Sequence, residues 1–301
     1  MAANTREIRR RIKSIKNTAQ ITKAMQMVAA SKMRKAQAAA LAGRPYAQLL
    51  NRVLASLAPG KGGEFTHELL EQREGGKELV ILLSTDKGLC GALNTNLLRE
   101  AGKYDPEKTV FIAVGRKGMQ FLLRGKREVI AEFELKDNFS FLDSKAASKF
   151  ALEKFLAHEV NRVTIVYTDF VNTLTQVPRT RTVLPVCTFE ATIHAPASVG
   201  GGKVEPTPPP PGQEPAKEYL FEPDASAVLG GILPHYVHFE VYQMALDARA
   251  SEHSARMVAM KSATDNAKQL IKDLTLEYNK VRQASITTEI LEIATAQMTL
   301  G

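Results

Sequence analysis

The chain has 301 residues, 44% of them hydrophobic, and a formal net charge of +8 at pH 7. At about 150 residues per domain the length predicts roughly two structural units, and the lack of any apolar run of about 18 residues excludes a membrane-spanning helix. The Arg-rich start has no apolar core of the kind found in secretory signals, and its helical pattern favours a folded segment over a mitochondrial transit peptide.

Residues 1–42 contain neither Pro nor Gly and predict one helix, about 60 Å long at about 1.5 Å per residue. The segment carries ten Lys and Arg residues against a single acid, Glu7. Such a basic face is either simply solvated or meets an acidic protein or nucleic acid. The first aromatic residue is Tyr46, which disfavours single-strand nucleic-acid binding because that uses aromatic stacking. A 4–3 spacing predicts a coiled-coil seam through Ile8, Ile12, Ile15, Ala19, Thr22, Gln26, Ala29, Met33, Ala36 and Ala40.

The middle of the chain alternates apolar strand patterns with helical patterns, which is typical of a three-layer α/β domain. The last strand contains Pro178 and Pro185 and is therefore expected at a sheet edge. Asp143 is expected to cap the third helix. The expected strands are 78–84, 110–114, 129–135, 162–168 and 176–187, and the expected helices are 94–103, 117–124 and 143–158.

No pattern in this region predicts catalysis, a cofactor or a metal ion. Residues 84–91 are Gly-containing and precede a helix, but they lack both G-x-G-x-x-G and the Walker A ending, so a tight strand–helix turn is favoured over a nucleotide site. Cys90 has no adjacent His to activate it, and Cys90 and Cys187 are expected to be reduced thiols. Residues 199–217, rich in Pro and Gly, predict a mobile surface excursion.

Residues 235–300 contain neither Pro nor Gly and predict a second helix, about 100 Å long. Pro234 is expected in its first turn, after a break at Gly230–Gly231 that ends a short helix begun near Asp224. An antiparallel pair with the first helix is expected, with a seam through Ala263, Ala267, Leu270, Leu274, Glu277, Val281, Ala284, Thr288 and Leu291. The last turns are apolar on several sides, which predicts burial inside a partner; they contain Ile286, Ile290, Leu291, Ile293, Ala294, Met298 and Leu300.

Three blocks strongly resemble the gamma subunit of F-type, bacterial-type ATP synthase. They are ITKAMQMVAASKMRKAQ at 21–37, STDKGLCGALN at 84–94, and the run 255–296, which contains the family's C-terminal signature ITTEILEI at 286–293. The excursion 199–217 departs from the usual family length. Plant plastid members carry a cysteine-bearing redox insert in this part of the chain, whereas only Cys187 is nearby here. The resemblance therefore implies a member without the dithiol switch.

The resemblance implies an α+β protein. A discontinuous shaft of residues 1–57 and 218–301 would form an asymmetric antiparallel coiled coil, with an inserted Rossmann-like three-layer domain at 75–192. It implies a non-catalytic rotor that turns inside a ring of alpha and beta subunits and contacts the epsilon subunit and the membrane c-ring. The expected location is peripheral, on the cytoplasmic face of the bacterial inner membrane. No nucleic acid, cofactor, metal or direct membrane span is expected.

Several residues match family positions that make contacts. Lys23 and Met25 match the segment that faces the acidic catch loop of beta, and Arg282 and Gln283 match the pair that engages beta from the other helix. The tip residues expected in the apolar sleeve of the ring are Ile286, Glu289, Ile290 and Ile293. Two alternatives stay open: a dinucleotide-binding enzyme with helical dimerisation arms, and a basic coiled-coil protein that binds nucleic acid.

Overall fold

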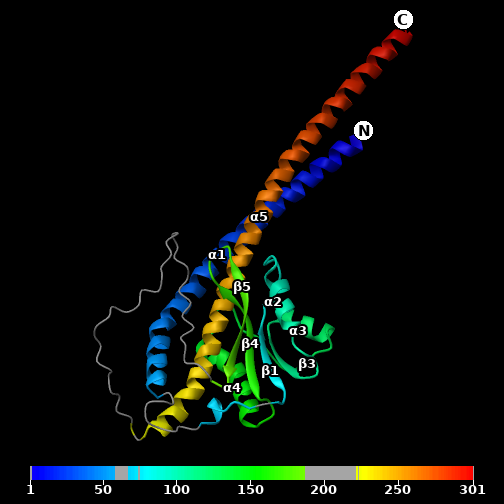
Figure 1. Cartoon of the computed structure of the whole chain (residues 1–301). Helices are drawn as coiled ribbons and strands as arrows, with labels where there is room; N and C mark the ends of the chain where they lie inside the picture. The colour runs from blue at the N-terminus through cyan, green and yellow to red at the C-terminus, as the bar shows by residue number, and fades with distance from the viewer. Residues whose placement is uncertain (1, 58–66, 74, 187–221, 223, 301) are drawn as a thin grey trace. The chain divides into compact units, whose positions relative to one another are not determined.

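The computed structural model describes residues 2–57, 67–73, 75–186, 222 and 224–300 (Figure 1). The excursion at 199–217 and Cys187 lie outside these residues, so the expectations about them stay predictions. The chain divides into two compact units, which are described separately below. One contains Met1–Ala30 and Arg256–Gly301, and the other contains Ser31–Ala255.

Both predicted terminal helices are present, and both are longer than the breaker-free segments. Helix α1 spans Ala2–Leu57 and continues through Gly43 and Pro45. A Cβ atom at Gly43 would lie 3.0 Å from Gln243 Oε1 and 3.4 Å from Phe239 Cζ. Glycine at this position therefore lets α1 approach α5 closely within the Ser31–Ala255 unit. The Gln243 amide crosses the contact by donating to the Ala40 carbonyl at 3.3 Å.

Helix α5 spans Ala225–Leu300 without interruption, so the break predicted at Gly230–Gly231 and the start predicted at Pro234 are wrong. A glycine in a helix costs about 1 kcal/mol relative to alanine, and a proline removes one backbone donor. Here the penalties are offset by burial, because Leu229 and Leu233 are only 3% and 0% exposed. Tertiary packing therefore carries the helix through residues that would end it in isolation.

The first unit is an antiparallel pair formed by the outer parts of α1 and α5. Thr22 and Thr264 share a buried hydroxyl–hydroxyl hydrogen bond of 2.7 Å, and Arg9 donates to the Tyr278 hydroxyl. All ten seam positions predicted on α1 are buried or half-buried, which confirms that seam.

On α5 the predicted seam is half right. Ala267, Leu274, Val281 and Thr288 are buried or half-buried as predicted, and so is Ala263. The alternate positions were placed one residue too early, because Leu270, Glu277 and Ala284 are exposed while Ile271, Tyr278 and Ser285 are half-buried. Leu291 is also wrong, with 59% of it exposed. Both phases keep a 4–3 spacing, so spacing alone could not separate them.

The second unit is built on a five-stranded mixed sheet with the order β3-β2-β1-β4-β5. The strands β1 (Glu78–Leu83), β2 (Thr109–Val114), β3 (Glu128–Phe133) and β4 (Arg162–Phe170) are parallel. Strand β5 (Gln176–Leu184) runs antiparallel to β4 at the edge, which confirms the edge position predicted from its prolines.

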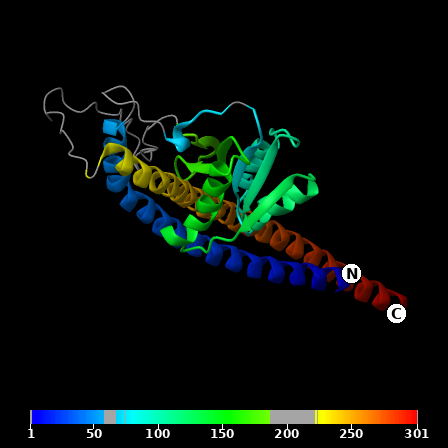
Figure 2. The ribbon, with the colours of Figure 1, turned by 90° about the horizontal axis from the view of Figure 1, so that it is seen from below.

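Helices cover both faces of the sheet, which confirms the three-layer arrangement (Figure 2). Helices α2 (Leu93–Ala101) and α3 (Arg116–Arg124) pack on one face, around Val80, Leu82 and Phe111. Helix α4 (Phe141–Leu156) and the inner parts of α1 and α5 pack on the other. The larger core on that side includes Ile81, Ile112, Phe155, Ile165 and Val241. A short 3-10 helix, η1 (Glu68–Leu70), precedes the sheet.

The start of α4 differs from the prediction by three residues. Ser140 is the N-cap and Asp143 is the third helical residue, so the assignment of Asp143 as the cap is wrong. The Ser140 hydroxyl accepts from the Asp143 amide, while the Asp143 carboxylate accepts from the Ser140 amide. This reciprocal capping box lowers the pKa of Asp143, because two hydrogen bonds from Ser140 stabilise the charged carboxylate.

Candidate contact surface of the terminal helices

The candidate contact residues on α1 lie beside the seam. Lys23 is exposed, and its ammonium group donates to Gln26 Oε1 at 3.5 Å. Met25 is half-buried beside the seam residue Gln26. The flexible lysine therefore faces solvent, whereas the methionine is partly covered by the helix pair.

The candidate pair on α5 is on the exposed side of the helix. Arg282 and Gln283 are both exposed, and the Arg282 guanidinium lies 6.0 Å from the centre of the Tyr278 ring. The guanidinium of Arg9 lies 5.4 Å from the same ring and also donates to its hydroxyl. Two cations from different helices thus lie within cation–π distance of one aromatic ring. No contact role is expected from the sequence for Arg9 or Tyr278, although a seam shifted by one residue includes Tyr278.

The structure does not bring the four candidate residues to one place. Thr22 lies opposite Thr264 and Arg9 lies opposite Tyr278, which fixes the antiparallel register. Lys23 is therefore next to the region of Ala263, which is about 28 Å from Arg282 along the axis at about 1.5 Å per residue. The unit thus offers two separate contact points.

The end of α5 presents apolar side chains to solvent. Ile286, Ile290 and Ile293 are 48%, 60% and 64% exposed, and Glu289 is exposed among them. The threonines of this segment turn their hydroxyls to their own helix: Thr287 donates to the Gln283 carbonyl at 3.0 Å and Thr288 to the Ala284 carbonyl at 2.9 Å. The free surface of this tip is therefore largely apolar, as at sites where a partner binds. The side chains of residues 298–300 lie outside the described part.

The N-terminal helix gives the same unit a basic surface. Its single acid, Glu7, pairs with Arg11 at 2.6 Å, and both side chains are exposed. An exposed pair of this kind contributes about 0–1 kcal/mol and leaves the surplus of positive charge in place. The bases of residues 5–30, all exposed, are Arg6, Arg9, Arg10, Arg11, Lys13, Lys16 and Lys23.

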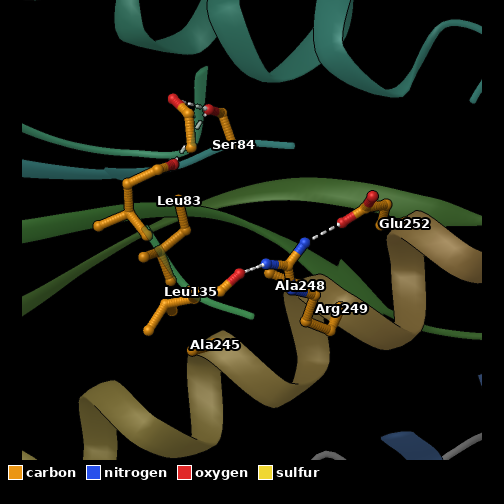
Figure 3. Close-up of a pocket in the computed structure, with 9 residues that line it drawn as sticks. Leu83, Ser84, Leu135, Ala245, Ala248, Arg249 and Glu252 are labelled. Atoms are coloured by element: carbon orange, nitrogen blue, oxygen red, sulfur yellow. Dashed lines mark hydrogen bonds and ion pairs between the residues drawn. The ribbon is translucent and has the colours of Figure 1, made fainter. Parts of the chain in front are cut away.

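In the second unit, helix α5 fills the crevice where doubly wound sheets bind ligands, at the carboxyl ends of the strands. The cavity that remains there has about 20 Å³, which is room for about one water molecule. The Arg249 guanidinium occupies this position (Figure 3): it donates to the Leu135 carbonyl and pairs with Glu252 at 2.7 Å. The cavity is lined by Leu83, Ser84, Val114, Gly115, Leu135, Ala245, Ala248, Arg249 and Glu252.

The segment at 84–91 forms a tight turn, as the sequence favoured. Ser84 Oγ accepts from the Gly118 amide at 2.7 Å, which ties the turn to the start of α3. Gly115 adopts φ +94°, and a Cβ there would lie 2.3 Å from the Ser84 carbonyl oxygen. Cys90 is 2% exposed, and its sulfur accepts from Asn94 Nδ2 at 3.3 Å.

Comparison with known proteins decides the family. Residues 4–300 match the sequence profile of a family described as ATP synthase. The ATP synthase gamma chain of Methylacidiphilum infernorum is 51% identical, covering 99% of this chain and 100% of that protein. The chain belongs to the ATP synthase gamma chain family. A second member, from Opitutus terrae, is 50% identical, with 98% of each chain covered.

Solved structures of ATP synthases contain chains with a similar fold. One match is in the cryo-EM structure of the Euglena gracilis mitochondrial ATP synthase with OSCP, F1 and c-ring, in rotational state 3. It has a TM-score of 0.66 at 20% identity, with 100% of this chain and 95% of that chain covered. The rotor of the same enzyme in rotational state 1 gives a TM-score of 0.65 at 21% identity, with coverages of 95% and 100%. Among the residues described here, no helix has a stretch long and apolar enough to cross a membrane.

Proposed function

We propose that this gamma-family chain is the central-stalk rotor of a proton-translocating ATP synthase, and that it couples rotation of the c-ring to the conformational cycle of the catalytic beta subunits. The observation that carries the proposal is the first unit: a two-helix pair whose α5 end exposes Ile286, Ile290 and Ile293. Exposed apolar surface of this kind fits a partner that encloses it.

The mechanism we propose is a population shift driven by orientation. The two sides of the helix pair differ, because α1 is strongly basic whereas residues 235–300 carry nearly balanced charge. Each orientation would therefore contact one beta conformation better than the others, and that differential contact would favour it. The chain itself contributes contacts and no catalytic groups.

The proposed partners bind two different surfaces, the long helices and the α/β domain. Alpha and beta subunits would surround the shaft of residues 1–57 and 218–301, with Lys23, Met25, Arg282 and Gln283 contacting beta. The tip residues Ile286, Glu289, Ile290 and Ile293 would lie in an apolar sleeve. The epsilon subunit and the c-ring would bind the α/β domain at 75–192. The chain would be a peripheral subunit on the cytoplasmic face of the bacterial inner membrane.

Co-purification tests the proposal. An affinity-tagged chain expressed at its native level should recover alpha, beta and epsilon subunits together with ATPase activity. Purified chain should show no stoichiometric binding of labelled ATP in equilibrium dialysis. Recovery of nucleic acid in place of these subunits, with an affinity that falls steeply as salt rises, would show that the basic helix serves a nucleic-acid-binding protein.

A further inference from the structure

Helix α5 is buried on all sides over about two turns, from Arg249 to Ala255. An amphipathic helix on the surface of a domain normally buries only one stripe. Here every residue of the segment is buried, and most of them are polar: Arg249, Ser251, Glu252, His253 and Ser254 are at most 8% exposed. Such a segment needs partners around its whole circumference.

Arg249 provides the first set of contacts. Its guanidinium donates to the Leu135 carbonyl in the loop after β3, and it lies 3.6 Å from the Asp86 carboxylate in the loop after β1. The same group pairs with Glu252 on its own helix at 2.7 Å. One planar side chain therefore joins α5 to the loops that follow two strands, β1 and β3. Figure 3 shows its contacts with Leu135 and Glu252.

Two serines provide the second set, on the β4 side. Ser251 Oγ donates to the Thr168 carbonyl of β4 at 3.1 Å, and Ser254 Oγ donates to the Thr173 carbonyl in the following turn at 2.8 Å. Both serines are 0% exposed. Ala255 lies in a small apolar cluster with Cys90 and Leu93, which belong to the segment that follows β1.

Asp137, in the loop between β3 and α4, completes the ring of contacts. Its carboxylate accepts a hydrogen bond from Lys32 of α1, and its other oxygen lies 4.0 Å from His253 Nε2 of α5. This single loop therefore contacts both long helices within the Ser31–Ala255 unit.

We propose that Arg249–Ala255 and the sheet-edge groups that contact them form a polar socket, which holds α5 at a fixed angle about its own axis. The socket would set the torsional stiffness between the sheet and the helix. Apolar packing is non-directional and tolerates rotation, whereas hydrogen bonds weaken steeply once donor and acceptor are misaligned. The inference rests on the proposed rotor function, in which torque must pass from the α/β domain into α5.

Two double variants remove the directional contacts while keeping the packing. Arg249→Met with Glu252→Leu replaces a buried ion pair by apolar side chains of similar volume, a change that is often neutral for stability. Ser251→Ala with Ser254→Ala removes only the two hydroxyl contacts to the sheet. The matched controls lie outside the socket: Asp265→Leu with Lys268→Met breaks an exposed ion pair of 3.8 Å, and Ser262→Ala removes an exposed serine.

Stiffness is measured on the assembled complex with the ring of alpha and beta subunits immobilised and turnover stalled by a non-hydrolysable nucleotide. A rod is attached to a cysteine introduced at the exposed Leu123 of α3, with Cys187 replaced by serine, and its angular variance is recorded. Each socket variant removes two of the five contacts between α5 and the sheet or its loops, so the variance should rise by about 1.5-fold to twofold. The controls should keep the variance of the parent.

The outcomes separate this inference from the proposed function. Parental variance in both socket variants, in complexes that assemble normally, overturns the socket and leaves the rotor function standing. If neither variant folds or assembles, the contacts serve folding itself, and the socket as a separate device is also overturned. Failure of the unmodified chain to join alpha and beta subunits would instead overturn the proposed function.

Discussion

At the scale of single residues, His238 shows how burial sets the behaviour of a titratable group. Its side chain is 7% exposed on α5, and its Nδ1 shares a hydrogen bond of 2.7 Å with Ser148 Oγ of α4. Burial lowers the pKa of His238 to about 4, and the neighbouring charges of Lys145, His235 and Lys149 act in the same direction. The folded state therefore holds a neutral imidazole over most of the pH range.

Acidification should destabilise the chain through this histidine. His238 takes up a proton near the ordinary pKa of 6.5 in the unfolded chain but only near pH 4 in the folded chain. Its contribution to the free energy of unfolding is therefore fully present above pH 6.5 and is lost as the pH falls from 6.5 to about 4. Replacing His238 by Gln keeps a partner for Ser148 and removes the titration. Thermal unfolding between pH 7.5 and 4.5 should show a fall in stability that is smaller in the variant by about 1–3 kcal/mol. Equal falls would show that His238 is protonated in the folded state.

Gly115 occupies a backbone position that no residue with a Cβ atom can take without strain. Gly115→Ala should destabilise the chain by about 2–4 kcal/mol, because φ +94° and the approach to the Ser84 carbonyl both exclude a Cβ. Gly88→Ala is the matched control, since a Cβ there meets no atom within 4 Å. Denaturant midpoints compare the two, and similar midpoints would contradict the argument.

At the scale of elements, the sequence predicts well which helices and strands exist. It fails where tertiary contacts decide where a helix ends or which residues it buries. Long segments without Pro and Gly predict both terminal helices, and alternating apolar runs predict the sheet. The continuation of α5 through Gly230 could not be predicted, because it depends on the burial of Leu229 and Leu233. The burial of the polar segment around Arg249 could not be predicted either, because its partners come from loops distant in sequence. The contact residues Lys23, Met25, Arg282 and Gln283 came only from the family resemblance and stay predictions.

The seam of the helix pair carries one testable polar contact. Thr22 and Thr264 share a buried hydrogen bond, and each hydroxyl is also within hydrogen-bond distance of a carbonyl of its own helix. Since a hydroxyl has one proton, one threonine donates across the seam while the other donates to its own helix. Thr22→Val and Thr264→Val should each cost about 1 kcal/mol, and the double variant should cost less than their sum by about 0.5–1 kcal/mol. Thr275→Val, an exposed hydroxyl bonded to the Ile271 carbonyl at 2.6 Å, is the control. Unfolding followed by circular dichroism gives these values, and strict additivity would mean that the two hydroxyls do not interact.

At the scale of the whole molecule, the chain combines a basic helix pair with an α/β unit whose ligand crevice is filled by its own helix. Arg249 lies at the carboxyl ends of the strands, beside the small cavity that remains there, and pairs with Glu252 of its own helix. The α/β fold therefore supports the long helices. The proposed contacts with the alpha and beta subunits would then come from the exposed surfaces of those helices.

Replacing Arg282 and Gln283 tests the proposed coupling most directly. Both are exposed and lie off the seam of Ile271, Leu274, Tyr278 and Val281, so changing both to Ala should leave the helix pair folded. A charged hydrogen bond from Arg282 to a beta subunit would be worth about 1.5–3 kcal/mol, so its loss should lower the ATPase rate of the reconstituted complex about tenfold or more. Gln269→Ala with Lys272→Ala removes one amide and one base from exposed positions of the same helix, and this control should keep the parental rate.

The comparison is informative only if the helices are intact, so circular dichroism and recovery of the complex are measured on both double variants. A slow complex with Arg282→Ala and Gln283→Ala, beside a normal one with the control changes, would show that this point of α5 acts on catalysis through contact. Since Arg9 shares the Tyr278 ring with Arg282, Arg9→Ala should produce a smaller loss of rate in the same assay. If the Arg282 and Gln283 variant turns over and pumps protons like the parent, the two residues are solvated positions of the helix, and the coupling contact lies elsewhere on the shaft.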